Sequence, residues 1–472
     1  MPGGQRRRSC GLCRSSLPPG ALGGDTIKRL YPIAKWLLAA ATLWIALWRV
    51  LLWQILEPLL YVTIDRMAAF VHLMETQIRL DIPSLTILLS QVILVVTTAL
   101  LAAREGTLRN RKFWLMALPL AIFLLVAALS RFWSVMPAST VKRVWFLATV
   151  TLGGIWIGTQ FRKREILLLY ELLSVLLILG SYALILKYPK FATGPDYDQF
   201  LMWTGILMYK GYAGSIMAFA ATVFLLRLSE WRSLRWPRRV FEVIFLGLAV
   251  LMVYKSNSAT AQIALLASAA ALLLGLAWIR WRDALRPWHY RAVGVATVSA
   301  LLLGLLALPR LLALLGRDIT FTGRLPLWRA LQAEVAARPL LGWGFGDAFW
   351  LSDHVQRVWQ VMAWKPGTAH SGFVEILLDT GLVGFAAVLG LLGTTAVLSA
   401  RYLRRHPSRD SLFFPMWLVL VVLVNVGENL LATYELFFWL ALVVMFAHAA
   451  QDFAGAAISP PPASMSADLA PS

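Results

Sequence analysis

Long apolar runs follow one another along most of the chain, and shorter polar segments separate them. A helix that crosses about 30 Å of hydrocarbon, at a rise of about 1.5 Å per residue, needs about 20 mostly apolar residues. Runs close to this length lie near residues 35–53, 85–103, 113–130, 142–159, 165–186, 212–228, 239–254, 261–279, 292–309, 374–400, 412–425 and 434–450. The pattern predicts an all-α, polytopic membrane protein with about twelve transmembrane helices.

The polar segments divide the chain into regions. Residues 1–34 form a basic tail, residues 35–309 contain nine predicted spans, residues 374–450 contain three more, and residues 451–472 form a tail rich in Pro, Ala and Ser. Both tails are expected to be disordered. The interval 310–373, between the ninth and tenth spans, is too long for a bare turn. We therefore expect one large loop there, with helices of its own.

The distribution of charge predicts on which side of the membrane each of these regions lies. A chain that is 59% hydrophobic and 14% charged cannot present the surface of an ordinary water-soluble protein. The formal net charge is +20, but the basic residues gather on every second loop, as cytoplasmic loops do. We expect both termini in the cytoplasm, the large loop on the outer face, and contact with anionic lipid rather than nucleic acid. The basic clusters are Arg6, Arg7, Arg8, Arg14, Lys28 and Arg29; Arg104, Arg109, Arg111 and Lys112; Arg162, Lys163 and Arg164; Arg232, Arg235, Arg238 and Arg239; Arg280, Arg282, Arg286 and Arg291; and Arg401, Arg404, Arg405 and Arg409.

Sequence motifs for metal or nucleotide chemistry are missing. The chain has no Walker A loop, HExxH, GxSxG or aspartate-rich motif. Cys10 and Cys13 form a single CxxC in the basic tail, whereas a zinc ribbon needs a second pair and a redox site needs a thioredoxin-like context. The sequence thus predicts no cofactor and no metal.

The large loop contains a candidate anion site. In TGRLPLWRALQAEVAARPLLGWGFG, Thr322 can cap a helix with Pro326 in its first turn and Trp328 on its apolar stripe. Arg324 lies beside this cap, where the helix dipole disfavours a cation. This placement indicates an anionic partner, although an Arg that extends toward lipid phosphate would look the same.

A candidate base and a second cation lie nearby in the same half of the membrane. His370 stands where the large loop meets the tenth span, and a pKa near 6.5 makes a histidine the natural proton acceptor for a hydroxyl nucleophile. Glu375 either orients it or is a helix-start charge. Lys210 lies on the outer side, where a Lys is less expected, and can hold a phosphate. The alternatives are an interfacial His and a snorkelling Lys; Arg131, Arg143, Arg329, Arg338 and Arg357 are weaker candidates.

The two strings GRLPLWRALQAEVAARPLLGWGFGDAFW and AHSGFVEILLDTGLVG resemble the signature region of the O-antigen ligase and polymerase superfamily, and most of all its exopolysaccharide production branch. Weaker matches, WSVMP, GILMYKGYAG and SNSATA, extend the resemblance over most of the chain. Gly211 stands where the family usually has Asn, and Ser371, which matches the small polar residue of the pattern, stands where many members have Asn after the histidine. The matching positions are Gly323, Arg324, Trp328, Arg338, Pro339, Gly342, Gly344, Phe349, Trp350, His370, Ser371 and Gly372.

The resemblance implies a metal-independent glycosyl transfer on the periplasmic face of the bacterial inner membrane. It implies a glycan on undecaprenyl diphosphate as donor, a growing glycan or lipid A core as acceptor, and other polysaccharide export components as further partners. In this reading His370 is the base, and Arg324 and Lys210 hold the diphosphate, with Arg338 as a further candidate. Glu375, Trp328, Gly342 and Gly344 are supporting residues.

Four other functions are alternatives for the same topology. A ligase would differ from a polymerase only in its acceptor. A secondary transporter is expected to show internal repeats with broken helices, and no such repeat is visible. A flippase needs a hydrophilic cavity lined by its spans, and the predicted spans offer few ionisable residues beyond Arg49. A scaffold role also stays open.

Overall fold

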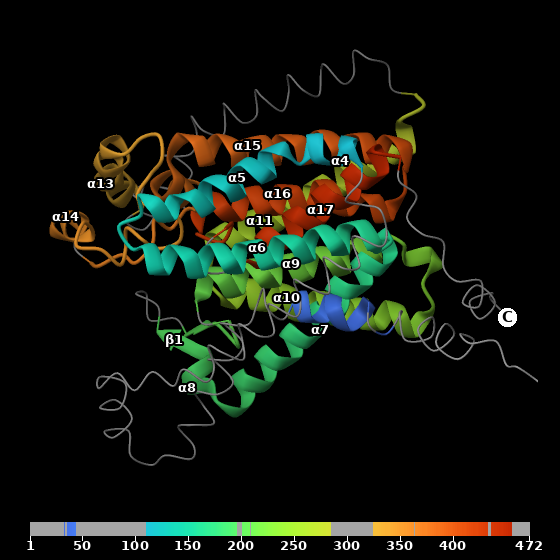
Figure 1. Cartoon of the computed structure of the whole chain (residues 1–472). Coiled ribbons are helices and arrows are strands. Elements are labelled where there is room, and N and C mark those ends of the chain that lie inside the picture. The colour runs from blue at the N-terminus through green and yellow to red at the C-terminus, as the bar shows by residue number, and fades with distance from the viewer. Residues whose placement is uncertain are drawn as a thin grey trace, which may run out of the picture.

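The computed structural model describes residues 33, 35–43, 110–195, 201–207, 209–284, 324–362, 364–432 and 436–455. These residues are mostly helical, and the long helices run side by side in a bundle (Figure 1). Most of both tails, Arg49, and the predicted spans near 85–103 and 292–309 lie outside the described residues, whereas residues 451–453 of the predicted C-terminal tail belong to the helix Phe437–Phe453. The predicted count of about twelve spans therefore stays a prediction.

Each predicted span in the described part has a helix within a few residues of its expected bounds. Four described helices are long and apolar enough to cross a membrane, and Arg409–Gly427 is a fifth such segment. The two short predicted spans, near 239 and 412, are α10 and α16. The helices are α4 (Arg111–Met116), α5 (Leu118–Leu129), η2 (Ser130–Phe132), α6 (Pro137–Gln160), α7 (Lys163–Lys187), α8 (Pro189–Ala192), α9 (Lys210–Leu228), η3 (Trp231–Ser233), α10 (Trp236–Lys255), α11 (Ala259–Trp281), α13 (Arg324–Ala337), α14 (Val355–Val361), α15 (Gly372–Arg405), η4 (Arg409–Leu412), α16 (Phe413–Gly427) and α17 (Phe437–Phe453).

The described part of the chain departs from the all-α prediction at one place. Strands β1 (Thr193–Pro195) and β2 (Leu201–Trp203) form a small antiparallel pair, with Thr193 opposite Trp203. Thr and Trp favour extended backbone, and the pair lies outside the predicted spans. The large interval 310–373 contains helices α13 and α14, which lie together at one end of the bundle (Figure 1).

Two helices form the centre of the bundle. Helix α9 packs against α7, α10, α11 and α16, and α17 packs against α4, α6, α15 and α16. Nearly all side chains of both helices are buried. The first half of α9 is rich in Gly, Ala and Ser, and small residues let neighbouring helices approach closely. The ends of these packed helices are therefore held in fixed relation to one another.

Helix α15 is broken at Gly381, whose φ of 63° and ψ of −165° are non-helical. A break frees backbone groups that need partners away from water. The glycine-rich segment after α13 supplies them, because Trp343 N donates to the Leu378 carbonyl at 2.9 Å and Gly344 N donates to the Asp379 carbonyl at 3.0 Å. The two amides that follow Gly381 donate to the carbonyls of residues 339 and 340. Backbone pairing thus joins the large loop to a membrane helix.

Replacing Gly381 with Ala is expected to destabilise the fold by at least about 2 kcal/mol, because the left-handed φ strains any side chain. An added Cβ would also lie 2.3 Å from the Leu340 backbone. The control is Gly393→Ala on the same helix, where an added Cβ meets nothing within 4 Å and Ala is the better helix former. Thermal unfolding of the purified proteins in detergent measures both. If the Gly381→Ala and Gly393→Ala proteins unfolded at the same temperature, the helix break at Gly381 would not be important for stability.

Candidate functional site

Four charged or titratable side chains meet where the ends of α9, α13, α15 and α16 come together. Arg324 is the first described residue of α13, and its Nη2 donates to Glu428 Oε1 at 2.9 Å. Its Nη1 donates to Thr260 Oγ1, in the first turn of α11, at 3.5 Å. Both charged side chains are mostly covered, with Arg324 19% and Glu428 15% exposed. Arg324, for which the sequence predicts an anionic partner, therefore has such a partner within the protein, the Glu428 carboxylate.

The Glu428 carboxylate also lies against the first turn of α9. A Cβ added at Gly211 would be 2.4 Å from its Cδ, so only a glycine leaves room for it there. Lys210 is the residue before Gly211, and its charge acts on the same carboxylate. Burial raises the pKa of Glu428, and the charges of Arg324 and Lys210 oppose that rise. Glu428 thus connects the two predicted phosphate-binding cations.

His370 faces the same group of residues. Burial, and to a lesser extent the charge of Arg324, lowers the pKa of its imidazole to about 4. The ring is therefore neutral near pH 7 and able to accept a proton. Its backbone has a left-handed φ of 49°, a conformation that is uncommon outside glycine and often marks functional sites. The Trp364 ring lies 5.4 Å away, centroid to centroid.

The peptide before His370 is held from two sides. Trp328 Nε1 donates to the Ala369 carbonyl at 2.8 Å, and the Ala369 amide donates to Glu375 Oε2 at 2.6 Å. The other oxygen of Glu375 accepts from Trp350 Nε1 at 2.5 Å. Glu375 and Trp328 therefore position His370 through the backbone of Ala369.

The residues after His370 are tied to α16. Ser371 Oγ donates to the Asn425 carbonyl at 3.2 Å, and Gly372 N donates to the Glu428 carbonyl at 2.9 Å. The segment that carries His370 is thus bonded directly to the residue that pairs with Arg324.

The structure does not bring Arg338 to this group. Arg338 follows the other end of α13, so about 20 Å of helix separates it from Arg324. Its Nη1 donates to the Trp133 carbonyl at 3.2 Å, and its guanidinium lies 4.3 Å from the centre of the Trp343 ring. Gly342 and Gly344, also predicted as supporting residues, lie in the segment that pairs with the break in α15. Lys210, Arg324 and His370 are therefore the predicted residues that meet.

Glu428 is the residue that sequence reasoning missed. It follows a short predicted span on the outer side, where an acidic residue looks like an ordinary loop charge. Its partner Arg324 is 104 positions away, so nothing local identifies it. Among the residues that the structure describes, no group of three or more His, Cys, Asp or Glu side chains is arranged to hold a metal ion, and the metal-free site stays a prediction. The predicted cap Thr322 and Gly323 lie outside the described residues.

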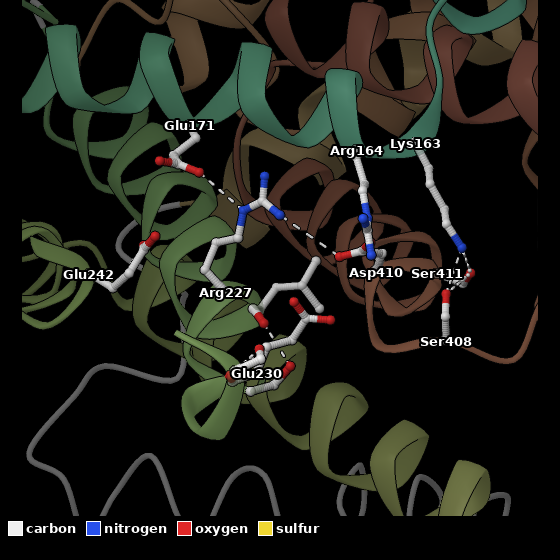
Figure 2. Close-up of polar contacts among 12 residues, drawn as sticks. Lys163, Arg164, Glu171, Arg227, Glu230, Glu242, Ser408, Asp410 and Ser411 are labelled. Carbon is white, nitrogen blue, oxygen red and sulfur yellow. Dashed lines mark hydrogen bonds and ion pairs between the residues drawn. The ribbon is translucent and has the colours of Figure 1, made fainter. Parts of the chain in front are cut away.

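A second ionic cluster lies near the start of α7 and the end of α9 (Figure 2). Arg227 stands between two carboxylates, with its Nε 3.1 Å from Glu171 Oε2 and its Nη1 3.8 Å from Asp410 Oδ1. Arg164 Nε also pairs with Asp410, at 3.0 Å. The expectation of few ionisable residues in the spans was wrong, because several of the described helices at the predicted spans contain them. The ionisable residues within these helices include Glu171, Arg227, Glu242, Glu375 and Asp379.

Comparison with known proteins finds one matching family. Residues 243–389 match a protein family described as O-antigen ligase, and this segment includes Arg324 and His370 but neither Lys210 nor Glu428. The chain is a polytopic membrane protein, and its resemblance to the O-antigen ligase superfamily is confirmed over residues 243–389.

A particular relative supports the same superfamily. The chain is similar to the exopolysaccharide production protein ExoQ of Rhizobium meliloti (strain 1021), with 29% identity over 160 residues, which is 31% of this chain and 35% of the relative. The match thus spans about a third of the length of that relative.

Proposed function

We propose that this protein is a polysaccharide polymerase that transfers a glycan from undecaprenyl diphosphate to a sugar hydroxyl on the periplasmic face of the inner membrane. The observation that carries the proposal is the meeting of Arg324, Lys210 and the neutral His370 around Glu428. A diphosphate leaving group needs cations, and a hydroxyl nucleophile needs a base. The site brings the cations and the base together in one group of residues.

In the proposed step, the acceptor hydroxyl oxygen attacks the anomeric carbon of the donor sugar. The bond from that carbon to the diphosphate oxygen breaks, and the undecaprenyl diphosphate leaves with the electron pair. His370 takes the hydroxyl proton as the new glycosidic bond forms. The Arg324 guanidinium and the Lys210 ammonium stabilise the negative charge that develops on the leaving group.

The remaining predicted residues have positioning roles in this proposal. Glu375 and Trp328 hold the peptide before His370, while Gly342 and Gly344 connect the loop to α15. Arg338 is proposed to stabilise the loop through Trp133 and Trp343, in place of a direct contact with the diphosphate.

The acceptor separates the two closest alternatives. A polymerase would extend a growing glycan, and a ligase would deliver the glycan to lipid A core. The name of the similar protein refers to exopolysaccharide production, which favours the polymerase.

A complementation experiment tests the function. In a strain that lacks this protein, we expect lipid-linked single repeat units to accumulate and long surface polysaccharide to be lost, and we expect the wild-type protein to restore both. Long lipid-linked polymer that never reaches lipid A core would favour the ligase. Unchanged polysaccharide together with unchanged lipid-linked units would contradict both and would favour a transporter of another substrate.

A further inference from the structure

The Arg324 side chain faces a carboxylate of the protein itself. Glu428 Oε1 is 2.9 Å from Arg324 Nη2, and both groups are mostly covered. A covered ion pair of this kind costs desolvation energy that its own attraction offsets only when the geometry is good. If the pair were only a support, an uncharged contact would serve as well. Its position in the site, beside both cations and the base, gives it a further role.

The carboxylate occupies the place that an external anion would take. It lies between the guanidinium of Arg324 and the first turn of α9, against Gly211 and beside Lys210. The first turn of a helix presents unpaired amides and the positive end of the helix dipole. A phosphate group that bound both cations would therefore need the space that the Glu428 carboxylate fills.

We propose that Glu428 competes with the donor diphosphate for Arg324, so that a lipid-linked phosphate must displace the carboxylate before it binds both cations. This inference rests on the proposed function. In the substrate-free protein the carboxylate neutralises Arg324, and the donor displaces it on binding. A diphosphate, with more charge than a single carboxylate, makes this exchange favourable. A lipid monophosphate gains less from the same cations and displaces Glu428 less readily.

The structure allows the exchange without movement of the backbone. The Glu428 amide donates to the Val424 carbonyl at 2.8 Å, and its carbonyl accepts from Gly372 N at 2.9 Å. These bonds fix the main chain on both sides of the residue. In the exchange that we propose, only the Glu428 side chain moves, and the segment that carries His370 keeps its position.

The test measures binding of undecaprenyl diphosphate and undecaprenyl monophosphate to the purified full-length protein. Glu428→Gln keeps the shape of the side chain and removes its charge. We expect this variant to bind the diphosphate about tenfold more tightly than the wild type, which corresponds to about 1.4 kcal/mol, and to bind the monophosphate more tightly by a similar factor, because both ligands must displace the same carboxylate. Asp353→Asn is the matched control, because Asp353 is an exposed acid of the large loop. We expect its binding to be unchanged.

The outcomes separate the inference from the function on which it rests. Equal or weaker diphosphate binding by a folded Glu428→Gln protein overturns the competition, because it means that Glu428 only holds Arg324 in place. If the wild type and the variant are both folded and neither protein binds either lipid, the proposed function is overturned as well. Thermal unfolding shows which proteins are folded.

A titration of the wild-type protein provides a second measurement that needs no variant. Lowering the pH neutralises Glu428, whose pKa is raised by burial, so we expect diphosphate binding to tighten relative to Glu428→Gln as the pH falls from about 8 to about 5. His370, with a pKa of about 4, stays mostly neutral in this range. A wild-type affinity that falls relative to the variant, or does not change, overturns the competition.

Discussion

Replacing His370 with Asn is expected to lower the rate of glycan transfer by about 10²–10⁴-fold, the usual contribution of a general base. Asparagine tolerates the left-handed backbone that residue 370 adopts, so the loop keeps its conformation. The variant loses only the group that accepts the hydroxyl proton. Cells that contain it should accumulate lipid-linked single units and make little long polysaccharide, at the same protein level as the wild type.

The control for this experiment is a second histidine of the large loop. His354 is the residue before α14, and its ring lies 4.5 Å from the Trp343 ring, centroid to centroid, in a tilted arrangement. His354→Asn should leave transfer nearly unchanged. Near-normal polymer from the His370→Asn protein would show that His370 is not the base, and equal losses in both variants would point to a general effect on the loop.

Removing the charge of Arg324 is expected to lower the transfer rate by about 10²–10³-fold, as the loss of one group that stabilises transition-state charge does. Arg324→Gln alone would leave Glu428 covered and without its partner, and breaking such a pair destabilises a protein by about 3–5 kcal/mol. The informative variant is therefore Arg324→Gln with Glu428→Gln, in which both charges are removed together. This protein should be folded and inactive.

Two further variants sharpen the result. Arg329 is exposed on the same helix as Arg324, so Arg329→Gln removes an equal charge outside the site and should retain activity. Arg324→Lys keeps the charge but loses the planar fork that binds two phosphate oxygens, so we expect intermediate activity. Full activity in the doubly neutral protein would remove Arg324 from the proposed mechanism.

The helices were predictable because each apolar run carries its own signal. Even the short runs that became α10 and α16 contain enough apolar residues to mark a helix. The break at Gly381 was not predictable, because it depends on backbone groups of residues 339–344 that pair with it. Local composition shows a glycine in a helix and says nothing about its distant partner.

The candidate site was predictable in part. Arg324, Lys210 and His370 stood out because their charges or chemistry did not suit their surroundings. Glu428 did not stand out, because its meaning comes from an arginine 104 positions away. The separation of Arg338 from Arg324 could have been inferred, since the predicted helix between them already spans about 20 Å. Arg324 and Arg338 were predicted to share one site only because both belong to the same family motif.

The ionic cluster around Arg227 has a consequence for the biosynthesis of the protein. Glu171 is almost fully buried, yet Arg227 is synthesised 56 residues after it. The carboxylate therefore leaves the ribosome before the guanidinium that neutralises it exists. Asp410, which closes the cluster, follows Arg164 by 246 residues. Helix α7 reaches its final surroundings only after α9 has been made, and the cluster is complete only when most of the chain has been translated.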